Sequence, residues 1–268
     1  MSGAAMVSAD PIDAKLVIDG QEISTRAKAP EGYPFPEVIS GWLFREAETR
    51  ALQEDSFSNP GMLIVEEGIT AWSAVEGTAG KSCASCHGDV AESMKGVGAK
   101  YPTWNAEANK PFNLELQINA CREKNMGAEP YKFDDKAQIG LTALIKHQSL
   151  GLPMSVDLEP GAMKSWWEKG KDVYYTRTGQ LNMSCATCHE DNMGKMIRAD
   201  HLSQGQVNGF PTYRLKDGIN SLHNRFRGCI RDTRATIPKA FSDELMALEV
   251  YVTWRGTGLS IETPSVRQ

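Results

Sequence analysis

The chain has 268 residues, enough for roughly two domains at about 150 residues each. Its hydrophobic content of 41% and charged content of 24% are those of an ordinary soluble globular protein. The formal net charge of −5 argues against a general nucleic-acid binder, which shows a basic surface, and no apolar run reaches the roughly 18 residues of a membrane span.

The N-terminal region predicts an extension rather than a domain. The stretch KLVIDGQEI (15–23) has an Asp-Gly turn between apolar residues, which indicates a β-hairpin, and PEGYPFPE (30–37) is too rich in proline for a helix. The next segment, SGWLFREAETRALQED (40–55), predicts a helix with Ser40 as its N-cap. We expect residues 1–40 to pack on the rest of the chain or on a partner.

Two stretches carry a Cys-x-x-Cys-His box, KSCASCHGD (81–89) and MSCATCHED (183–191). This spacing is the attachment signature of a c-type haem, in which two thiols bind the porphyrin and the histidine binds its iron. A redox dithiol or a zinc site with four cysteines would leave both histidines unexplained. The sequence therefore predicts two covalently attached haems c. The expected thioether residues are Cys83, Cys86, Cys185 and Cys188, and the expected proximal ligands are His87 and His189.

The surroundings of the two boxes repeat along the chain. Cys83 and Cys185 lie 102 positions apart, and NLELQINACR (113–122) aligns with SLHNRFRGCI (221–230) at a shift of 108, with a helical segment and a glycine after each. We predict an all-α fold of two tandem cytochrome c-like domains, 41–152 and 153–268, joined at a segment rich in Pro and Gly and preceded by the extension with its short β-hairpin.

The alignment pairs the two remaining cysteines, Cys121 and Cys229. Three interpretations are open for these cysteines: each is a buried small side chain, the two form a disulfide between the domains, or each is the sixth ligand of its own haem. Equivalent positions in two repeated units should lie beside their own haems rather than beside each other, which favours the ligand interpretation and a low potential. The competing ligands do not align between the units. They are Met94, Met126, Met154, Met193, Met196, Met246, His147, His201 and His223.

The region around Cys229 is basic. Between Arg214 and Lys239 there are seven Lys or Arg residues and two Asp residues, although the whole chain is acidic. Such a run is often a solvated surface, but beside a haem box it favours an anion site, since guanidinium can bond two oxyanion oxygens. Arg225 stands four residues before Cys229, where the first unit has Gln117 before Cys121, so we infer that the second haem is the reaction centre.

The stretch LQEDSFSNPGMLIVEEGITAW (52–72), the two boxes and HNRFRGCIRDTR (223–234) together resemble the SoxA family. These are the catalytic dihaem subunits of the SoxAX cytochromes of bacterial thiosulfate oxidation, and the resemblance covers the chain from about residue 40 onward. It implies His87 and Cys121 on one haem iron, and His189 and Cys229 on the other. It also implies that Cys229, often a persulfide in the family, is the active-site cysteine, with Arg225 as its substrate-binding neighbour.

The resemblance further implies an enzyme, an L-cysteine S-thiosulfotransferase that joins thiosulfate to a cysteine of the SoxYZ carrier and releases two electrons to a cytochrome c. Its partner would be SoxX, a small monohaem cytochrome c, in a heterodimer. Haem c attachment indicates the periplasm; since the first residues do not read as an export signal, we expect that such a signal has been removed. The alternatives are a plain dihaem electron carrier, a dihaem peroxidase and a scaffold that docks another cytochrome.

Overall fold

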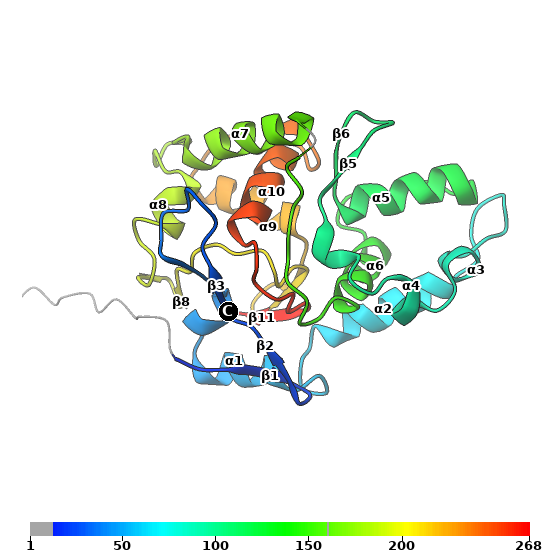
Figure 1. Cartoon of the computed structure of the whole chain (residues 1–268), viewed down its shortest axis with the longest axis horizontal. Helices are drawn as coiled ribbons and strands as arrows, with labels where there is room; N and C mark the ends of the chain where they lie inside the picture. Colours follow the sequence, from blue (N-terminus) through cyan, green and yellow to red (C-terminus); the bar gives the residue numbers. More distant parts are fainter. Residues whose placement is uncertain (1–12, 160) are drawn as a thin grey trace, which may run out of the picture.

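The structure is a computed structural model that describes residues 13–159 and 161–268, and helices are its main regular elements (Figure 1). Figure 1 shows α2, α5 and α6 at one end of the molecule and α7, α9 and α10 at the other. Among the described residues no helix is long and apolar enough to cross a membrane. The helices are α1 Ala47–Glu54, α2 Met62–Ser73, α3 Cys83–His87, α4 Val90–Ser93, α5 Leu114–Cys121, α6 Lys136–His147, α7 Gly161–Tyr175, α8 Cys185–His189, α9 Leu222–Asp232 and α10 Asp243–Arg255, with short turns η1 Gly41–Phe44, η2 Gly98–Lys100 and η3 Arg122–Met126.

The chain also forms short strands. The all-α prediction did not include them, apart from the first hairpin. They form two-stranded pairs, except for a three-stranded sheet of order β10-β9-β11 in which β11 runs parallel to β9. The strands are β1 Leu16–Ile18, β2 Gln21–Ile23, β3 Arg26–Lys28, β4 Glu37–Ile39, β5 Thr103–Asn105, β6 Lys110–Phe112, β7 Met196–Ile197, β8 Asp200–His201, β9 Thr212–Arg214, β10 Gly218–Asn220 and β11 Ser265–Arg267.

The predicted N-terminal hairpin is confirmed. β1 and β2 are antiparallel with Leu16 opposite Ile23, and the turn residues Asp19 and Gly20 both have positive φ, 49° and 85°. Two successive residues of positive φ give the turn a twist that matches the strands. Leu16 and Ile23 are buried together against η1.

The predicted helix over 40–55 is wrong in part, because the chain forms two separate helical pieces. Ser40 caps the short turn η1 by accepting a hydrogen bond from the Trp42 backbone N–H at 3.1 Å, as expected. The backbone is then extended at Arg45 and Glu46, and α1 begins only afterwards. The break directs the Arg45 side chain inward, where it is buried.

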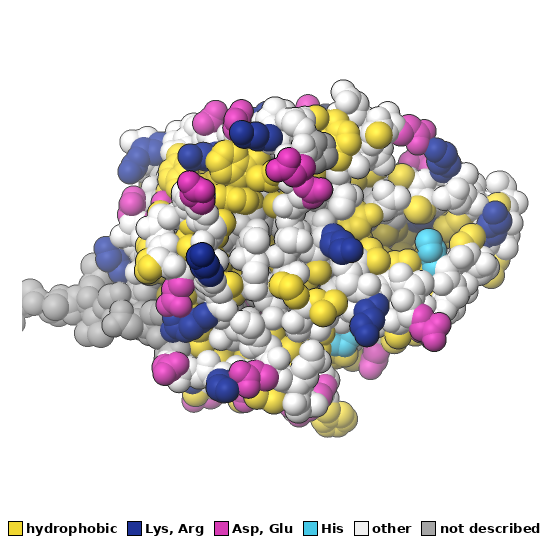
Figure 2. Space-filling view, viewed as in Figure 1, with side chains coloured by type: hydrophobic (Ala, Val, Ile, Leu, Met, Phe, Trp, Pro, Cys, Tyr) yellow, Lys and Arg dark blue, Asp and Glu magenta, His cyan; other side chains and the backbone are white. Residues whose placement is uncertain are grey.

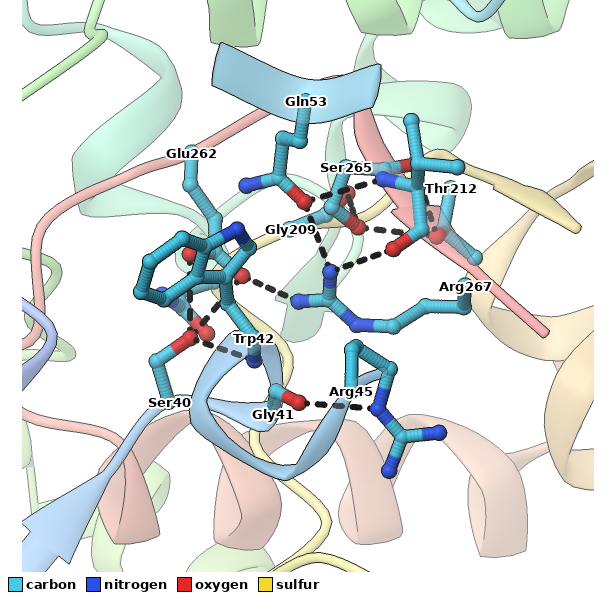
Figure 3. A network of polar contacts seen from close by, with 12 residues as sticks. Ser40, Gly41, Trp42, Arg45, Gln53, Gly209, Thr212, Glu262, Ser265 and Arg267 are labelled. Atoms are coloured by element: carbon cyan, nitrogen blue, oxygen red, sulfur yellow. Dashed lines mark hydrogen bonds and ion pairs between the residues drawn. The ribbon is translucent and has the colours of Figure 1, made fainter. Parts of the chain in front are cut away.

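Segments from the two ends of the chain are joined by buried polar contacts (Figure 3). The Ser40 hydroxyl donates to the Glu262 carboxylate at 2.9 Å. The Gln53 side-chain oxygen accepts from the Val266 backbone N–H at 3.0 Å and from the Arg267 guanidinium at 2.7 Å. These bonds fix η1 and α1 against β11, so residues 40–54 pack on the C-terminal strand.

A pair of crossing helices forms the core at each end of the molecule. α2 crosses α6 so closely that a Cβ on Gly68 would lie 2.2 Å from the Gly140 carbonyl oxygen. α7 crosses α10 in the same way, with the corresponding position on Gly170 at 1.9 Å from the Ala247 carbonyl oxygen. Only glycine permits such an approach of two backbones. Each pair has its own apolar cluster, one around Leu144 and one around Tyr251.

Candidate haem sites

Each Cys-x-x-Cys-His box forms one short helix, and a serine caps it. In α3 the Ser82 hydroxyl accepts from the Ser85 N–H and the Ser85 hydroxyl accepts from the Ser82 N–H, both at 3.0 Å. Ser184 and Thr187 exchange the same two bonds in α8, at 3.1 and 3.3 Å. Such a reciprocal capping box stabilises the first turn of a helix. Both boxes therefore lie on short, capped helices.

The second box opens into a cavity of about 640 Å³. Cavities of about 300–1,000 Å³ are typical of cofactor sites. Its walls include both thiols of the box, the adjoining histidine and the predicted sixth ligand and substrate residue. These are Cys185, Cys188, His189, Cys229 and Arg225. The described residues around this cavity thus fit a haem c.

His189 is held in the orientation that a haem ligand needs. Its Nδ1 lies 2.8 Å from the Ser203 carbonyl oxygen, and because a carbonyl oxygen only accepts, Nδ1 must donate. The other nitrogen, Nε2, is then free for iron, as is usual for metal-binding histidines. Burial lowers the pKa of His189 to about 4, against the raising effect of the Ser203 bond, and the Arg225 charge lowers it further. The imidazole is therefore neutral.

A glycine makes room for the His189 ring. Gly205 has a φ of +75°, and a Cβ there would lie 2.8 Å from Cγ and 2.9 Å from Nδ1 of the ring. Real side chains do not approach so closely. The short link from Ser203 to Gly205 thus supplies both the hydrogen-bond acceptor and the space for the ring.

Helix α9 brings Cys229 and Arg225 to the same cavity. The two residues are four positions apart, which places them on one face of the helix. Burial, and after it the nearby thiols of Cys229 and Cys188, raise the pKa of Cys185 to about 12. Burial and Cys229 also raise the pKa of Cys188. Cys229 thus lines the same cavity as both thiols of the second box.

The competing ligands of the second unit are placed elsewhere or are already engaged. Met193, Met196 and Met246 are not among the residues that line the cavity. His201 lines it, but its Nδ1 donates to the Gly194 carbonyl oxygen at 3.1 Å and its Nε2 lies 3.4 Å from the Glu46 carboxylate.

His223 is buried outside this cavity with both ring nitrogens bonded. Nδ1 accepts from the Phe241 N–H at 3.0 Å, and Nε2 lies 2.9 Å from the Glu249 carboxylate. In the first unit, His147 donates to the Thr263 carbonyl oxygen at 2.9 Å. Iron could bind His223 only by displacing one of its two partners, whereas the single bond of His147 among the described residues leaves its Nε2 open, as in His189.

The first site is more open. Cys86 and His87 are exposed, and the His87 ring lies beside Trp72 with the centroids 5.8 Å apart. Burial, and after it the Cys121 thiol, raises the pKa of Cys83. Figure 2 shows hydrophobic side chains and a histidine at the surface where Figure 1 draws α3 and α5. All six cysteines are free, which excludes the disulfide between Cys121 and Cys229 from this structure.

The sequence did not identify two further arginines of the second cavity, Arg45 and Arg267. Burial lowers the pKa of Arg45 to about 9, and the positive charges of Arg267 and Arg214 lower it further. Arg45 pairs with Asp200 and donates to the Gly41 carbonyl oxygen at 3.1 Å (Figure 3). Both residues come from the chain ends, far from either box, so no local sequence signal links them to the cavity.

Part of the basic run around Cys229 points away from the cavity. Arg214 lines it together with Arg225, but Arg227 donates to the Pro238 carbonyl oxygen at 3.2 Å and lies over the Phe133 ring at 5.1 Å. The Arg231 side chain is 69% exposed. Of these arginines, only Arg214 and Arg225 could therefore contribute to the predicted anion site.

Comparisons with known proteins agree with this architecture. A model of the SoxA/TsdA cytochrome c domain matches residues 67–154, which include the first box. The SoxA subunit of L-cysteine S-thiosulfotransferase from Pseudaminobacter salicylatoxidans is 70% identical over 99% of this chain and 93% of its own length. The chain belongs to the SoxA family.

Other SoxA proteins align over the same length. The subunit of that name from Rhodovulum sulfidophilum is 52% identical over 99% of this chain and 93% of its own length. A chain in the crystal structure of SoxXA from P. pantotrophus superimposes with a TM-score of 0.92 at 47% identity, covering 97% of this chain and all of that one. The SoxA resemblance of the sequence is thus confirmed, and with it a cytochrome c domain that binds haem covalently.

Proposed function

We propose that this chain is the catalytic subunit of an L-cysteine S-thiosulfotransferase. It joins thiosulfate to a cysteine thiol of a SoxYZ-type carrier as a cysteine S-thiosulfonate and passes two electrons to cytochrome c. The observation that carries the proposal is the convergence of Cys229, Arg225 and His189 on one cavity beside the second box. The names of the relatives, at up to 70% identity over the whole chain, support the same reaction.

Two haems c are proposed, one on each box. His87 and Cys121 would hold the iron of the first, and His189 and Cys229 that of the second. A haem bound at the second site supplies an acceptor for single electrons next to a thiolate sulfur. Three observations support the assignment at the second site: the free Nε2 of His189, the presence of Cys229 in the same cavity as both thiols of the box, and the engaged state of His201 and His223.

The two units, 41–152 and 153–268, are proposed to derive from a duplication, with residues 1–40 as an extension. Glycines support it: Gly68 and Gly170, 102 positions apart, sit at the two helix crossings. Gly77 and Gly179, also 102 apart, have φ values of +72° and +70° and touch the backbone that follows α5 and α9. A hairpin of the same position precedes each of these helices, β5–β6 and β9–β10.

Arg225 would orient thiosulfate in the cavity. Its guanidinium has no hydrogen bond or ion pair with another side chain among the described residues, so its donors are available to two oxyanion oxygens. Arg214, whose pKa is lowered by burial and by the Arg225 charge, adds positive potential on the same side. A dianion bound there would relieve the repulsion between these cations.

The sulfur chemistry would take place on Cys229. Its thiolate and the outer sulfur of thiosulfate form a sulfur–sulfur bond, and two electrons leave as it forms. The carrier thiolate then attacks the sulfur that came from thiosulfate, and the Cys229 thiolate leaves. The net reaction is balanced. The carrier thiolate and thiosulfate together carry three negative charges; the thiosulfonate product carries one, and the two released electrons account for the other two.

The partner is proposed to be a SoxX-type monohaem cytochrome c in a heterodimer, because the superimposed crystal structure is of SoxXA. The compartment is proposed to be the periplasm, where haem c is attached in bacteria. Reconstitution of the holo-complex with carrier and thiosulfate tests the proposal. Cys229→Ala should abolish thiosulfate-dependent electron transfer; a variant that kept the full rate would refute the assigned role.

A further inference from the structure

The residue four positions before each lone cysteine differs between the two units. Gln117 precedes Cys121 on α5, and Arg225 precedes Cys229 on α9. Residues four apart on a helix face the same side, so each can reach its cysteine sulfur. The two side chains nevertheless make different contacts.

Gln117 is bonded to the cysteine sulfur. Its Nε2 donates to the Cys121 Sγ at 3.5 Å, and the structure records no second hydrogen bond of the Gln117 side chain among the residues it describes. Sulfur is large and accepts at longer distances than oxygen does. The Gln117 amide therefore bonds to the same sulfur that is proposed to bind the iron of the first haem.

The helix that carries this contact is held on several sides. Asn113 caps α5 by accepting from the Leu116 N–H at 3.0 Å. The Asn119 amide exchanges two bonds with the Tyr131 backbone, at 2.9 and 3.0 Å. Arg122 reaches the Glu76 carboxylate at 2.6 Å. The helix that carries Gln117 and Cys121 is therefore anchored to neighbouring segments of the chain.

The second unit lacks this bond. Neither the Arg225 guanidinium nor the Cys229 sulfur has a side-chain hydrogen bond within the described part of the chain, although both line the cavity. The first unit thus has an amide donor, Gln117, bonded to its cysteine sulfur, whereas the second unit has at the same position a cation, Arg225, that faces the cavity.

We propose that Gln117 is a positioning residue that would restrain the Cys121 sulfur at the iron of the first haem and so keep this sulfur from taking part in sulfur transfer. A donor to a metal-bound thiolate withdraws electron density from it and raises the potential of the metal. The inference rests on the proposed ligation of the first haem by His87 and Cys121.

Two variants without the amide donor test it in the holo-complex. Gln117→Met keeps the length of the side chain, and Gln117→Glu replaces the donor by a carboxylate. Potentiometric titration followed by EPR should show a more negative midpoint potential for the first haem in both, with the larger shift in Gln117→Glu, and an unchanged second haem. The matched control is Gln148→Met, because Gln148 also bonds four residues back but to the Leu144 carbonyl oxygen, at 3.2 Å.

The outcomes separate this inference from the proposed ligation. Cys121→Met identifies the EPR signal of the first haem; if it changes neither signal, the ligation is wrong. If it changes one signal and both Gln117 variants leave that haem's potential at the wild-type value, only the role of Gln117 is wrong. A loss of thermal stability without a shift in potential would show a merely structural role and would also overturn the inference.

Discussion

Gly205→Ala should disturb the second haem site more than its backbone strain alone explains. The residue has a φ of +75°, and an alanine in this left-handed conformation costs about 1–2 kcal/mol. Its Cβ would also lie 2.8 Å from the His189 ring, so the ring must move, at about 1–3 kcal/mol for overpacking. Loss of the Nδ1 bond to the Ser203 carbonyl oxygen adds about 1 kcal/mol. We expect a total of about 3–6 kcal/mol.

Gly218→Ala is the matched control. Gly218 has nearly the same φ, +76°, but no heavy atom of the described residues lies within 4 Å of the position that a Cβ would take. This variant should lose only the backbone contribution of about 1–2 kcal/mol.

Denaturant unfolding of the holo-protein measures both costs, and EPR reports the second haem. The loss in free energy of unfolding should be about 2–4 kcal/mol larger for Gly205→Ala than for Gly218→Ala, and only Gly205→Ala should change the EPR signal of the second haem. Equal costs together with an unchanged signal would refute the account of how Gly205 seats the His189 ring.

Three further predictions concern the anion site, a buried carboxyl and a helix crossing. Arg225→Gln should weaken the apparent affinity for thiosulfate about 10- to 150-fold in steady-state assays, because a hydrogen bond from a charged group contributes about 1.5–3 kcal/mol. The control variant Arg231→Gln, on the exposed side of α9, should bind thiosulfate as the wild type does. Equal effects of the two substitutions would exclude a specific anion site at Arg225. Burial raises the pKa of Glu115 from its ordinary 4.5 to about 7, so the unfolded chain releases this proton first and wild-type stability falls between these pH values. Glu115→Gln should therefore gain about 3 kcal/mol in free energy of unfolding relative to wild type as the pH rises from 4.5 to 7, and a difference independent of pH would contradict the shift. Gly170→Ala should cost several times more stability in thermal unfolding than Gly161→Ala. A Cβ on Gly170 would lie 1.9 Å from a backbone oxygen of α10, whereas a Cβ on Gly161 has no described atom within 4 Å. Similar losses would count against a close crossing of α7 and α10.

Local signals in the sequence were sufficient for much of the site. The boxes identify themselves by spacing, and both ligand helices begin where the sequence has a capping residue, Asn113 before α5 and Ser221 before α9. The Arg225–Cys229 pair follows from helical spacing alone. The same spacing places Arg227 on another face, so the sequence could have excluded it from the anion site.

Contacts distant in the chain could not be predicted. Arg45 reaches the cavity because the chain is extended between η1 and α1, and that break accompanies packing against the C-terminal β11. The sequence of residues 40–55 predicts a continuous helix, but tertiary contacts override this helical propensity. Likewise, nothing in the residues near Gly205 shows that the His189 ring will lie against it.

EPR with near-infrared spectroscopy of the oxidised holo-complex tests the proposed axial ligands most directly. We predict that the haems on both boxes give low-spin signals of the thiolate type, and that Cys229→Met changes only the signal of the second haem. A methionine–iron charge-transfer band in the spectrum of this wild-type chain, or thiolate-type signals that persist unchanged in Cys229→Met and Cys121→Met, would contradict the proposed ligation.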